Sequence, residues 1–130
     1  MSPADRVVLI VDDEPGIREV LRRSLEAAGY QTREVSSPLE ACRVFGEERI
    51  DAVTLDLRMP GFSGFDFLEW LRSEPMAQAP AVPVFVLTGF GLTDKEKATL
   101  RRFHAGVFYK PHGVAEIVKC LGREVHRKSS

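Results

Sequence analysis

Three consecutive acidic residues follow an uninterrupted apolar segment near the start of the chain. The segment VVLIV, residues 7–11, runs directly into Asp12, Asp13 and Glu14. Carboxylates beside a buried strand lose hydration and repel one another, so either one of them is protonated or a cation lies among them. The stretch is therefore either an exposed turn or a binding site, and polar residues further along the chain distinguish the two.

Polar residues of complementary chemistry end three later apolar runs, namely Asp56, Thr88 and Lys110. In an open sheet of parallel strands, the carboxyl ends of the strands meet at one edge, and ligands bind there. Carboxylate oxygens with room for water suit Mg²⁺, and Mn²⁺ accepts the same ligands. Thr88 and Lys110 then add a hydroxyl and an ammonium for an anion beside the metal, best a phosphoryl group.

The elements that would bring these residues together alternate along the chain. Five segments have the length and composition of strands: residues 7–11, 31–35, 52–55, 84–87 and 107–109. Five others have the apolar periodicity of helices: residues 15–28, about 38–46, about 65–71, about 93–104 and about 114–125. This alternation predicts an α/β fold with a doubly wound parallel sheet and helices on both faces. The second strand, QTREV, is too polar to be buried on both faces and is expected at an edge of the sheet.

The size and composition of the chain fit one domain of about 130 residues. A net charge of −1 gives no electrostatic basis for direct binding of nucleic acid or an anionic membrane. The longest apolar runs are too short to cross a bilayer, and the opening MSPADR lacks the pattern of a signal peptide. Cys42 and Cys120 lie far apart, so both are predicted to be reduced. We therefore expect a cytoplasmic protein.

Four motifs together resemble one family. In chain order they are VLIVDDEPGIRE, DLRMPGFSGFDFLEWLR, VPVFVLTGFG and YKPHG. In combination they are similar to the receiver domain of two-component response regulators, over about residues 6–126. The resemblance implies a flavodoxin-like (βα)5 sheet with strand order 2-1-3-4-5. It also implies that residues 1–130 form a single receiver domain, with no output domain in this chain.

The resemblance assigns the role of phosphoacceptor nucleophile to Asp56. The phosphoryl group would come from a phosphohistidine on a sensor histidine kinase or a histidine phosphotransfer protein. Asp13 and Asp56 would bind Mg²⁺ directly with the backbone carbonyl of Arg58, and Asp12 would bind it directly or through water. No other cofactor is implied. The chain would catalyse only its own phosphorylation and dephosphorylation, and would not be an enzyme in any wider sense.

The same resemblance places the phosphoryl oxygens on Thr88 and Lys110. Arg58 and Phe90 would flank the path by which water reaches the phosphoryl group, two residues after Asp56 and Thr88 respectively. Bulky side chains there hinder an in-line attack, so slow self-dephosphorylation is expected.

Val107 occupies a position where the family often has an aromatic residue that turns inward on phosphorylation. Since valine is small and stiff at χ1, the signal is expected to pass mainly through residues 88–93 and the helix that follows, or through Tyr109. The last two helices and the last strand would form the face that binds an unknown downstream protein.

Three alternatives remain at this point. The domain would act as a phosphate sink, or as a receiver-like binding module that works without phosphorylation. A phosphatase of the haloacid-dehalogenase type also uses an aspartate at a strand end with Mg²⁺. That family has a second aspartate two residues later, where this chain has Arg58.

Overall fold

The computed structural model describes residues 5–57, 63–73, 82–89, 91–110 and 113–129, with side chains through residue 123. Its centre is a parallel five-stranded sheet made of β1 (Val7–Val11), β2 (Gln31–Val35), β3 (Ala52–Leu55), β4 (Val84–Thr88) and β5 (Ala105–Tyr109). The helices are α1 (Pro15–Ala27), α2 (Pro38–Glu47), α3 (Gly64–Ser73), α4 (Asp94–Arg102) and α5 (Gly113–Ser129). The strand order is β2-β1-β3-β4-β5, which confirms the predicted fold. The last strand begins two residues earlier than predicted, at Ala105.

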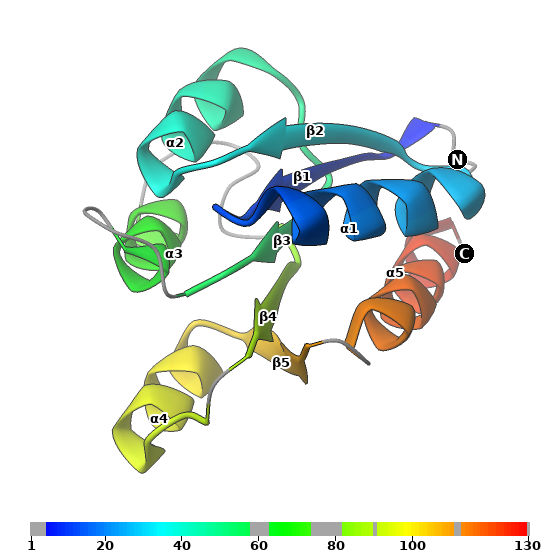
Figure 1. Cartoon of the computed structure of the whole chain (residues 1–130). Coiled ribbons are helices and arrows are strands. Elements are labelled where there is room, and N and C mark those ends of the chain that lie inside the picture. Colours follow the sequence, from blue (N-terminus) through cyan, green and yellow to red (C-terminus); the bar gives the residue numbers. More distant parts are fainter. Residues whose placement is uncertain (1–4, 58–62, 74–81, 90, 111–112, 130) are drawn as a thin grey trace.

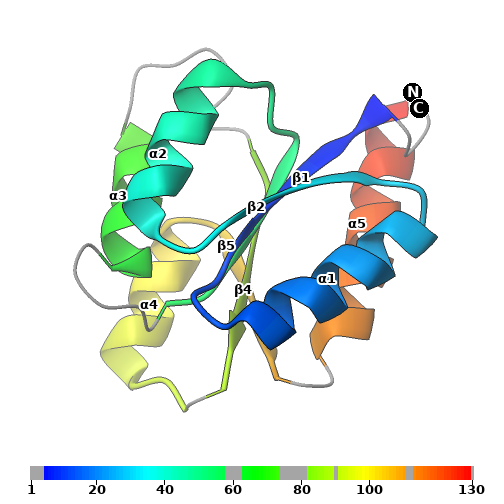
Figure 2. The ribbon, with the colours of Figure 1, turned by 45° about the horizontal axis from the view of Figure 1, so that its top comes forward.

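The helices form a layer on each face of the sheet (Figures 1 and 2). Helices α1 and α5 lie together on one face, and α2, α3 and α4 cover the other. The strand order reverses between β1 and β3, because the chain first moves outward to β2 and then returns past β1. The carboxyl ends of β1 and β3 therefore flank the switch point at which open α/β sheets bind ligands.

The apolar core has two parts, one on each face of the sheet. Side chains alternate along a strand, so Leu9 and Val11 pack toward α2 and α3, whereas Val8 and Ile10 pack toward α1 and α5. Strands β1, β3 and β4 are buried along almost their whole length. Burial on both faces is why β1 is apolar throughout and why β3 and β4 are apolar except for Thr54 and Thr88.

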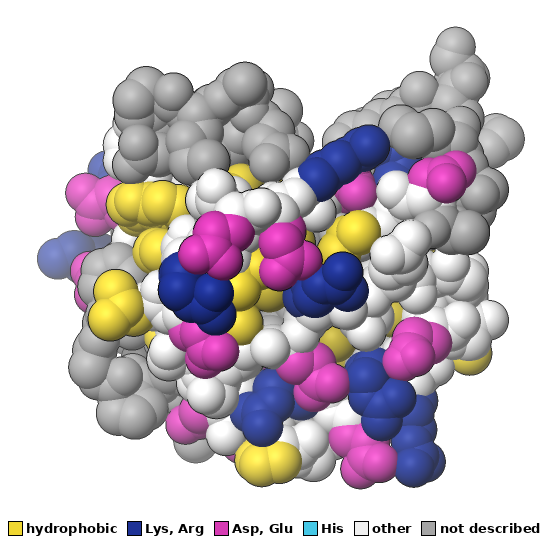
Figure 3. Space-filling model, turned by 90° about the horizontal axis from the view of Figure 1, so that it is seen from above, with side chains coloured by type: hydrophobic (Ala, Val, Ile, Leu, Met, Phe, Trp, Pro, Cys, Tyr) yellow, Lys and Arg dark blue, Asp and Glu magenta, His cyan; other side chains and the backbone are white. Residues whose placement is uncertain are grey.

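The polar strand β2 lies at an edge of the sheet, as its composition predicts. Its charged side chains form ion pairs with residues of flanking elements. Arg33 pairs with Glu48 at 2.7 Å, and Glu34 pairs with Arg18 at 3.6 Å and with Arg22 at 3.4 Å. Figure 3 shows acidic and basic side chains side by side on this face of the molecule. Charged side chains at an edge strand oppose pairing with a strand of another chain.

Hydroxyl side chains cap the N-termini of three helices. The Ser37 hydroxyl accepts a hydrogen bond from the backbone of Glu40 at the start of α2. At α4, Thr93 and Glu96 form a reciprocal capping box, each side chain accepting from the other's backbone N–H. Ser63 and Asp66 exchange the same kind of bonds before α3. Such caps satisfy N–H groups that have no partner within the helix.

Gly64 lets helix α3 begin directly against the strand end that carries Asp56. A Cβ atom at this position would lie 2.6 Å from the Asp56 carbonyl oxygen and 2.8 Å from the Leu57 Cα. Both neighbours are backbone, so they cannot move without displacing the strand end. The final glycine of the DLRMPGFSG motif is therefore required for close packing beneath Asp56.

In the part of the chain that the structure describes, no helix combines the length and apolar character needed to cross a membrane.

We expect Gly64→Ala to lower the free energy of unfolding by about 1–3 kcal/mol, because an added methyl group overpacks a backbone contact. Gly46→Ala is the matched control, since a Cβ atom there meets nothing within 4 Å. Gly46 lies inside α2, so its replacement by alanine is expected to stabilise the protein by about 0.5–1 kcal/mol. Urea unfolding monitored by circular dichroism measures both changes, and equal effects of the two variants would contradict the packing role of Gly64.

Candidate functional site

The polar strand ends meet at one edge of the sheet. Asp12 follows β1, Asp56 follows β3, Thr88 ends β4 and Lys110 follows β5. All strands are parallel, so their carboxyl ends lie on the same side of the molecule. The structure thus brings together residues that are separated by up to 98 positions in the sequence, the span from Asp12 to Lys110.

Four carboxylates form a cluster at this edge: Asp12, Asp13, Glu14 and Asp56. One ligand atom from each can be chosen so that all lie within 4.8 Å of one another. Asp12 and Asp56 are buried, with 1% and 4% exposure, whereas Asp13 and Glu14 are exposed. Oxygen donors in a partly open cluster suit a hard divalent cation such as Mg²⁺, which keeps some of its water. The residues present therefore fit the predicted metal site.

The loop after β1 is held in place by hydrogen bonds to Asp12. Its carboxylate Oδ1 accepts from the backbone N–H of Glu14 at 2.9 Å. Its backbone carbonyl accepts from Arg18 Nη1 at 2.6 Å, and the Arg18 side chain also pairs with Glu34. These contacts fix the Asp12 backbone and one carboxylate oxygen, while the other oxygen, Oδ2, faces Lys110 Nζ at 3.2 Å.

Lys110 projects its ammonium group into the carboxylate cluster. The Nζ atom lies 2.9 Å from Glu14 Oε1, 3.2 Å from Asp12 Oδ2 and 3.9 Å from Asp56 Oδ2. Burial lowers the pKa of Lys110, but the hydrogen bond to Glu14 and the charges of Asp12 and Asp56 outweigh it and raise the pKa overall. The amine is therefore protonated at neutral pH.

Burial also governs the charge of Asp12. Desolvation raises its pKa above the ordinary value of 3.8, against the lowering effect of the Glu14 backbone N–H and of Lys110. One ammonium shared among several carboxylates does not offset the whole cost of burying the Asp12 charge. A cation bound among the carboxylates would remove this deficit.

Thr88 lies on the other face of the sheet from the Lys110 side chain. Thr88 is completely buried. In the register between β4 and β5, Thr88 pairs with Tyr109 and Val86 pairs with Val107, so Thr88 shares a face of the sheet with Val107. Val107 packs against the part of the core beneath α2, α3 and α4. The backbone of Thr88 accepts the N–H of Lys110 at 2.9 Å, so the two predicted phosphoryl-binding residues are joined through the main chain.

Two predicted site residues, Arg58 and Phe90, lie outside the described residues. Of the remaining candidates, Asp12, Asp13, Asp56, Thr88 and Lys110 lie at the predicted edge. Val107 lies within β5 and packs against the core. Glu14 was assigned no role from the sequence, yet it makes the shortest ion pair to Lys110. The sequence feature that could have indicated a role for Glu14 is its position directly after the predicted ligands Asp12 and Asp13.

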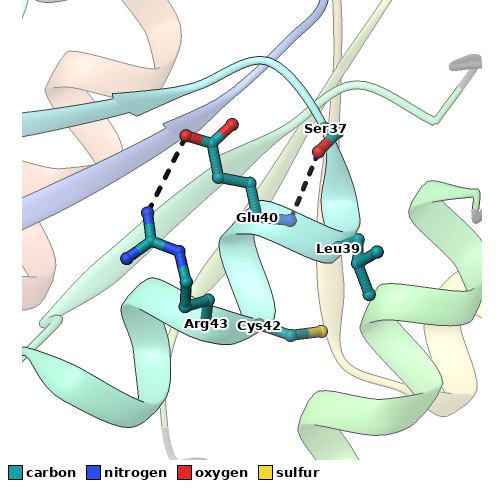
Figure 4. Close-up of a pocket in the computed structure, with 5 residues that line it drawn as sticks. All are labelled: Ser37, Leu39, Glu40, Cys42 and Arg43. Atoms are coloured by element: carbon teal, nitrogen blue, oxygen red, sulfur yellow. Dashed lines mark hydrogen bonds and ion pairs between the residues drawn. The ribbon is translucent and has the colours of Figure 1, made fainter.

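A separate hollow of about 620 Å³ lies at the start of α2, lined by Ser37, Leu39, Glu40, Cys42 and Arg43. Figure 4 shows Leu39 and Cys42 on the side facing α3, while the Glu40 and Arg43 side chains point toward each other. The Glu40–Arg43 ion pair spans 3.9 Å, and none of the clustered carboxylates lines the hollow. The hollow is therefore separate from the carboxylate cluster.

Comparison with known proteins agrees with this geometry. Residues 8–121 match the family described as the response regulator receiver domain. The chain belongs to this family. As a receiver domain, it is a module of two-component signalling.

The similar proteins include both short and long receivers. Sporulation initiation phosphotransferase F of Bacillus subtilis is 29% identical over 123 residues, which cover 95% of this chain and 96% of that protein. The phosphate regulon transcriptional regulatory protein PhoB of Pseudomonas aeruginosa is 30% identical over 94% of this chain and 52% of its own length. The receiver domain thus spans nearly all of the first relative and about half of the second.

Solved structures show the same architecture. The chemotaxis protein CheY4 of Vibrio cholerae superimposes with a TM-score of 0.80 at 28% identity, covering 91% of this chain and 97% of that one. A CheY-like receiver domain protein of Methanospirillum hungatei gives 0.83 at 18% identity, covering 95% and 96%. The second comparison bears on the fold alone.

Proposed function

We propose that this receiver domain accepts a phosphoryl group on Asp56 from a phosphohistidine of a sensor histidine kinase or histidine phosphotransfer protein. The observation that carries the proposal is the Asp56 carboxylate, which is 4% exposed and lies beside Asp12, Asp13 and the ammonium of Lys110. A buried carboxylate nucleophile with an ammonium and further acids beside it suits transfer of an anionic group together with a bound cation.

In the proposed reaction, a carboxylate oxygen of Asp56 attacks phosphorus as the P–N bond to the donor imidazole breaks. The bonding pair stays on the imidazole nitrogen, and the phosphoryl group becomes an acyl phosphate. Lys110 and Thr88 hold phosphoryl oxygens through an ammonium and a hydroxyl. Asp12, Asp13 and Asp56, with the backbone carbonyl of Arg58, would hold a Mg²⁺ ion whose charge offsets that of the phosphoryl oxygens.

The acceptor is consumed once in each transfer, so the domain acts as a signalling switch and not as an enzyme on other substrates. The name of the Bacillus subtilis relative describes a phosphotransferase, which supports a role in phosphoryl relay. The transcriptional regulators are about twice as long as the segment they share with this chain. We propose that the partners of this domain are proteins in the cytoplasm, and that its net charge of −1 does not favour direct binding of nucleic acid or an anionic membrane.

Phosphorylation is proposed to act on helix α4 and on the face made by α4, β5 and α5, which would bind a downstream protein. Thr88 and Tyr109 are register partners, so movement of the threonine toward a phosphoryl group bears directly on β5 and on the loop before α4. The far end of α4 is held by Arg72, which donates to the carbonyl of Phe103 at 2.8 Å and to that of Val82 at 2.7 Å. Movement would therefore be largest at the start of α4.

Asp56→Asn is expected to abolish labelling by radioactive acetyl phosphate or by a phosphorylated kinase. The amide keeps the shape of the side chain but is no longer a competent nucleophile. Asp94→Asn, an exposed aspartate in the first turn of α4, is the control and should label like the wild type. Label at the wild-type level in Asp56→Asn would exclude this residue as the acceptor.

Asp13→Ala is expected to weaken Mg²⁺ binding about tenfold or more, because it removes an oxygen ligand. Thr88→Ala should leave Mg²⁺ affinity nearly unchanged, since the Thr88 hydroxyl is proposed to bind a phosphoryl oxygen and not the metal. Isothermal titration calorimetry measures both affinities. At about 100 times its Kd, Mg²⁺ should also stabilise the wild type by about 2.7 kcal/mol. Equal losses in the two variants would refute this division of roles.

Beryllofluoride, a phosphoryl mimic, is expected to shift backbone NMR signals most between Gly89 and Phe103. The reason is that Thr88 ends the strand that leads to the start of α4, whereas Arg72 holds the far end of the helix. Asp56→Asn with the same additions is the control and should show no such shifts. Shifts confined to the carboxylate cluster would favour the phosphate-sink alternative.

A further inference from the structure

The ammonium of Lys110 lies closer to an exposed acid than to the predicted phosphoacceptor. Its Nζ atom lies 2.9 Å from Glu14 Oε1 and 3.9 Å from Asp56 Oδ2. The Glu14 side chain is 60% exposed, and that of Lys110 is 13% exposed. The closest partner of this largely buried cation is therefore the carboxylate at the mouth of the site.

The backbone of Glu14 is fixed by hydrogen bonds, whereas its side chain is exposed and contacts Lys110. Its N–H donates to Asp12 Oδ1 at 2.9 Å, and its carbonyl accepts from the N–H of Arg18 at 3.1 Å. Glu14 is also the N-cap of α1, and Pro15 follows it. The side chain thus projects from a fixed point over Lys110 and can leave by rotating into solvent.

We infer that Glu14 is a positioning residue that holds Lys110 in the unphosphorylated protein, so that an incoming phosphoryl group must displace the Glu14 carboxylate from the ammonium. This inference rests on the proposed function, because it concerns the same reaction at Asp56. Glu14 and the phosphoryl oxygens are both anionic and compete for one cation. Glu14 therefore weakens the phosphoryl-bound state and sets the threshold at which the switch responds.

The size of the effect follows from the exposure of the pair. An ion pair with a solvent-exposed partner is weak and screened by salt, so its loss changes an equilibrium by about twofold to fivefold. Glu14 also belongs to the cluster of four carboxylates that could hold a metal ion. The two possible roles of Glu14 lead to opposite results. If Glu14 is a metal ligand, its loss weakens binding of Mg²⁺. If Glu14 competes for Lys110, its loss strengthens binding of the phosphoryl anion.

The test compares wild type, Glu14→Gln and the control Glu19→Gln in saturating Mg²⁺, with the apparent Kd for beryllofluoride measured by NMR titration. Glu19 is an exposed acid of α1 that pairs with Arg23 at 2.9 Å, so its replacement removes the same charge without touching Lys110. Glu14→Gln should bind beryllofluoride about twofold to fivefold more tightly than wild type, and Glu19→Gln should not differ from it. The affinity for Mg²⁺ alone should fall far less in Glu14→Gln than in Asp13→Ala.

A double-mutant cycle shows whether Glu14 acts through Lys110. In a Lys110→Met background, Glu14→Gln should no longer tighten beryllofluoride binding. The same gain with and without Lys110 would mean a general charge effect and would overturn the inference, as would unchanged or weaker binding by Glu14→Gln. Loss of Mg²⁺ affinity equal to that of Asp13→Ala would make Glu14 a metal ligand and also overturn it. Failure of the wild type to bind beryllofluoride would overturn the proposed function together with this inference. Normal binding by the wild type with no gain in Glu14→Gln would overturn the inference alone, so the two failures are distinguishable.

Discussion

Crowding of carboxylates at the carboxyl edge of the sheet is the constraint on which the site depends. Four acids lie within reach of one common ion, and Lys110 is the ammonium that projects among them. Burial of Asp12 raises its pKa even with that ammonium nearby. The cluster is thus short of positive charge, and this deficit explains both its fit to a divalent cation and the protonation of Lys110.

The side chains of Lys110 and Thr88, which are both proposed to bind the phosphoryl group, lie on opposite faces of the sheet. Lys110 reaches Asp12 and Asp56 on the face covered by α1 and α5, whereas Thr88 points to the face covered by α4. Neighbouring residues of one strand point to opposite faces, so a ligand held at the edge by both side chains acts on both layers. The proposed switch uses this arrangement, since movement at Thr88 affects β5 and the start of α4 while the carboxylates stay in place.

Close packing beneath the site makes this arrangement precise. Gly64 brings the start of α3 against the backbone of Asp56 with no room for a Cβ atom. Arg72, near the other end of the same helix, bonds to the chain before β4 and to the end of α4. Helix α3 therefore packs against the proposed acceptor at one end and is bonded to the end of the proposed responding helix α4 at the other.

Much of the fold and the main site residues could be predicted from the sequence. The alternation of strands and helices is encoded locally, and parallel strands must present their carboxyl ends at one edge, so Asp12, Asp56, Thr88 and Lys110 were expected to meet. The polarity of QTREV likewise placed β2 at an edge. Local patterns of this kind are visible because each depends on neighbours within one element.

Contacts between distant elements were decided by the tertiary structure. Glu14 and Lys110 are 96 residues apart, and no pattern in either segment indicates that their side chains meet. The absence of space at Gly64 and the two bonds of Arg72 also depend on how α3 lies against other elements. The physical reason is that periodicity determines which face of an element is buried, whereas distances between side chains depend on how the packed elements fit together.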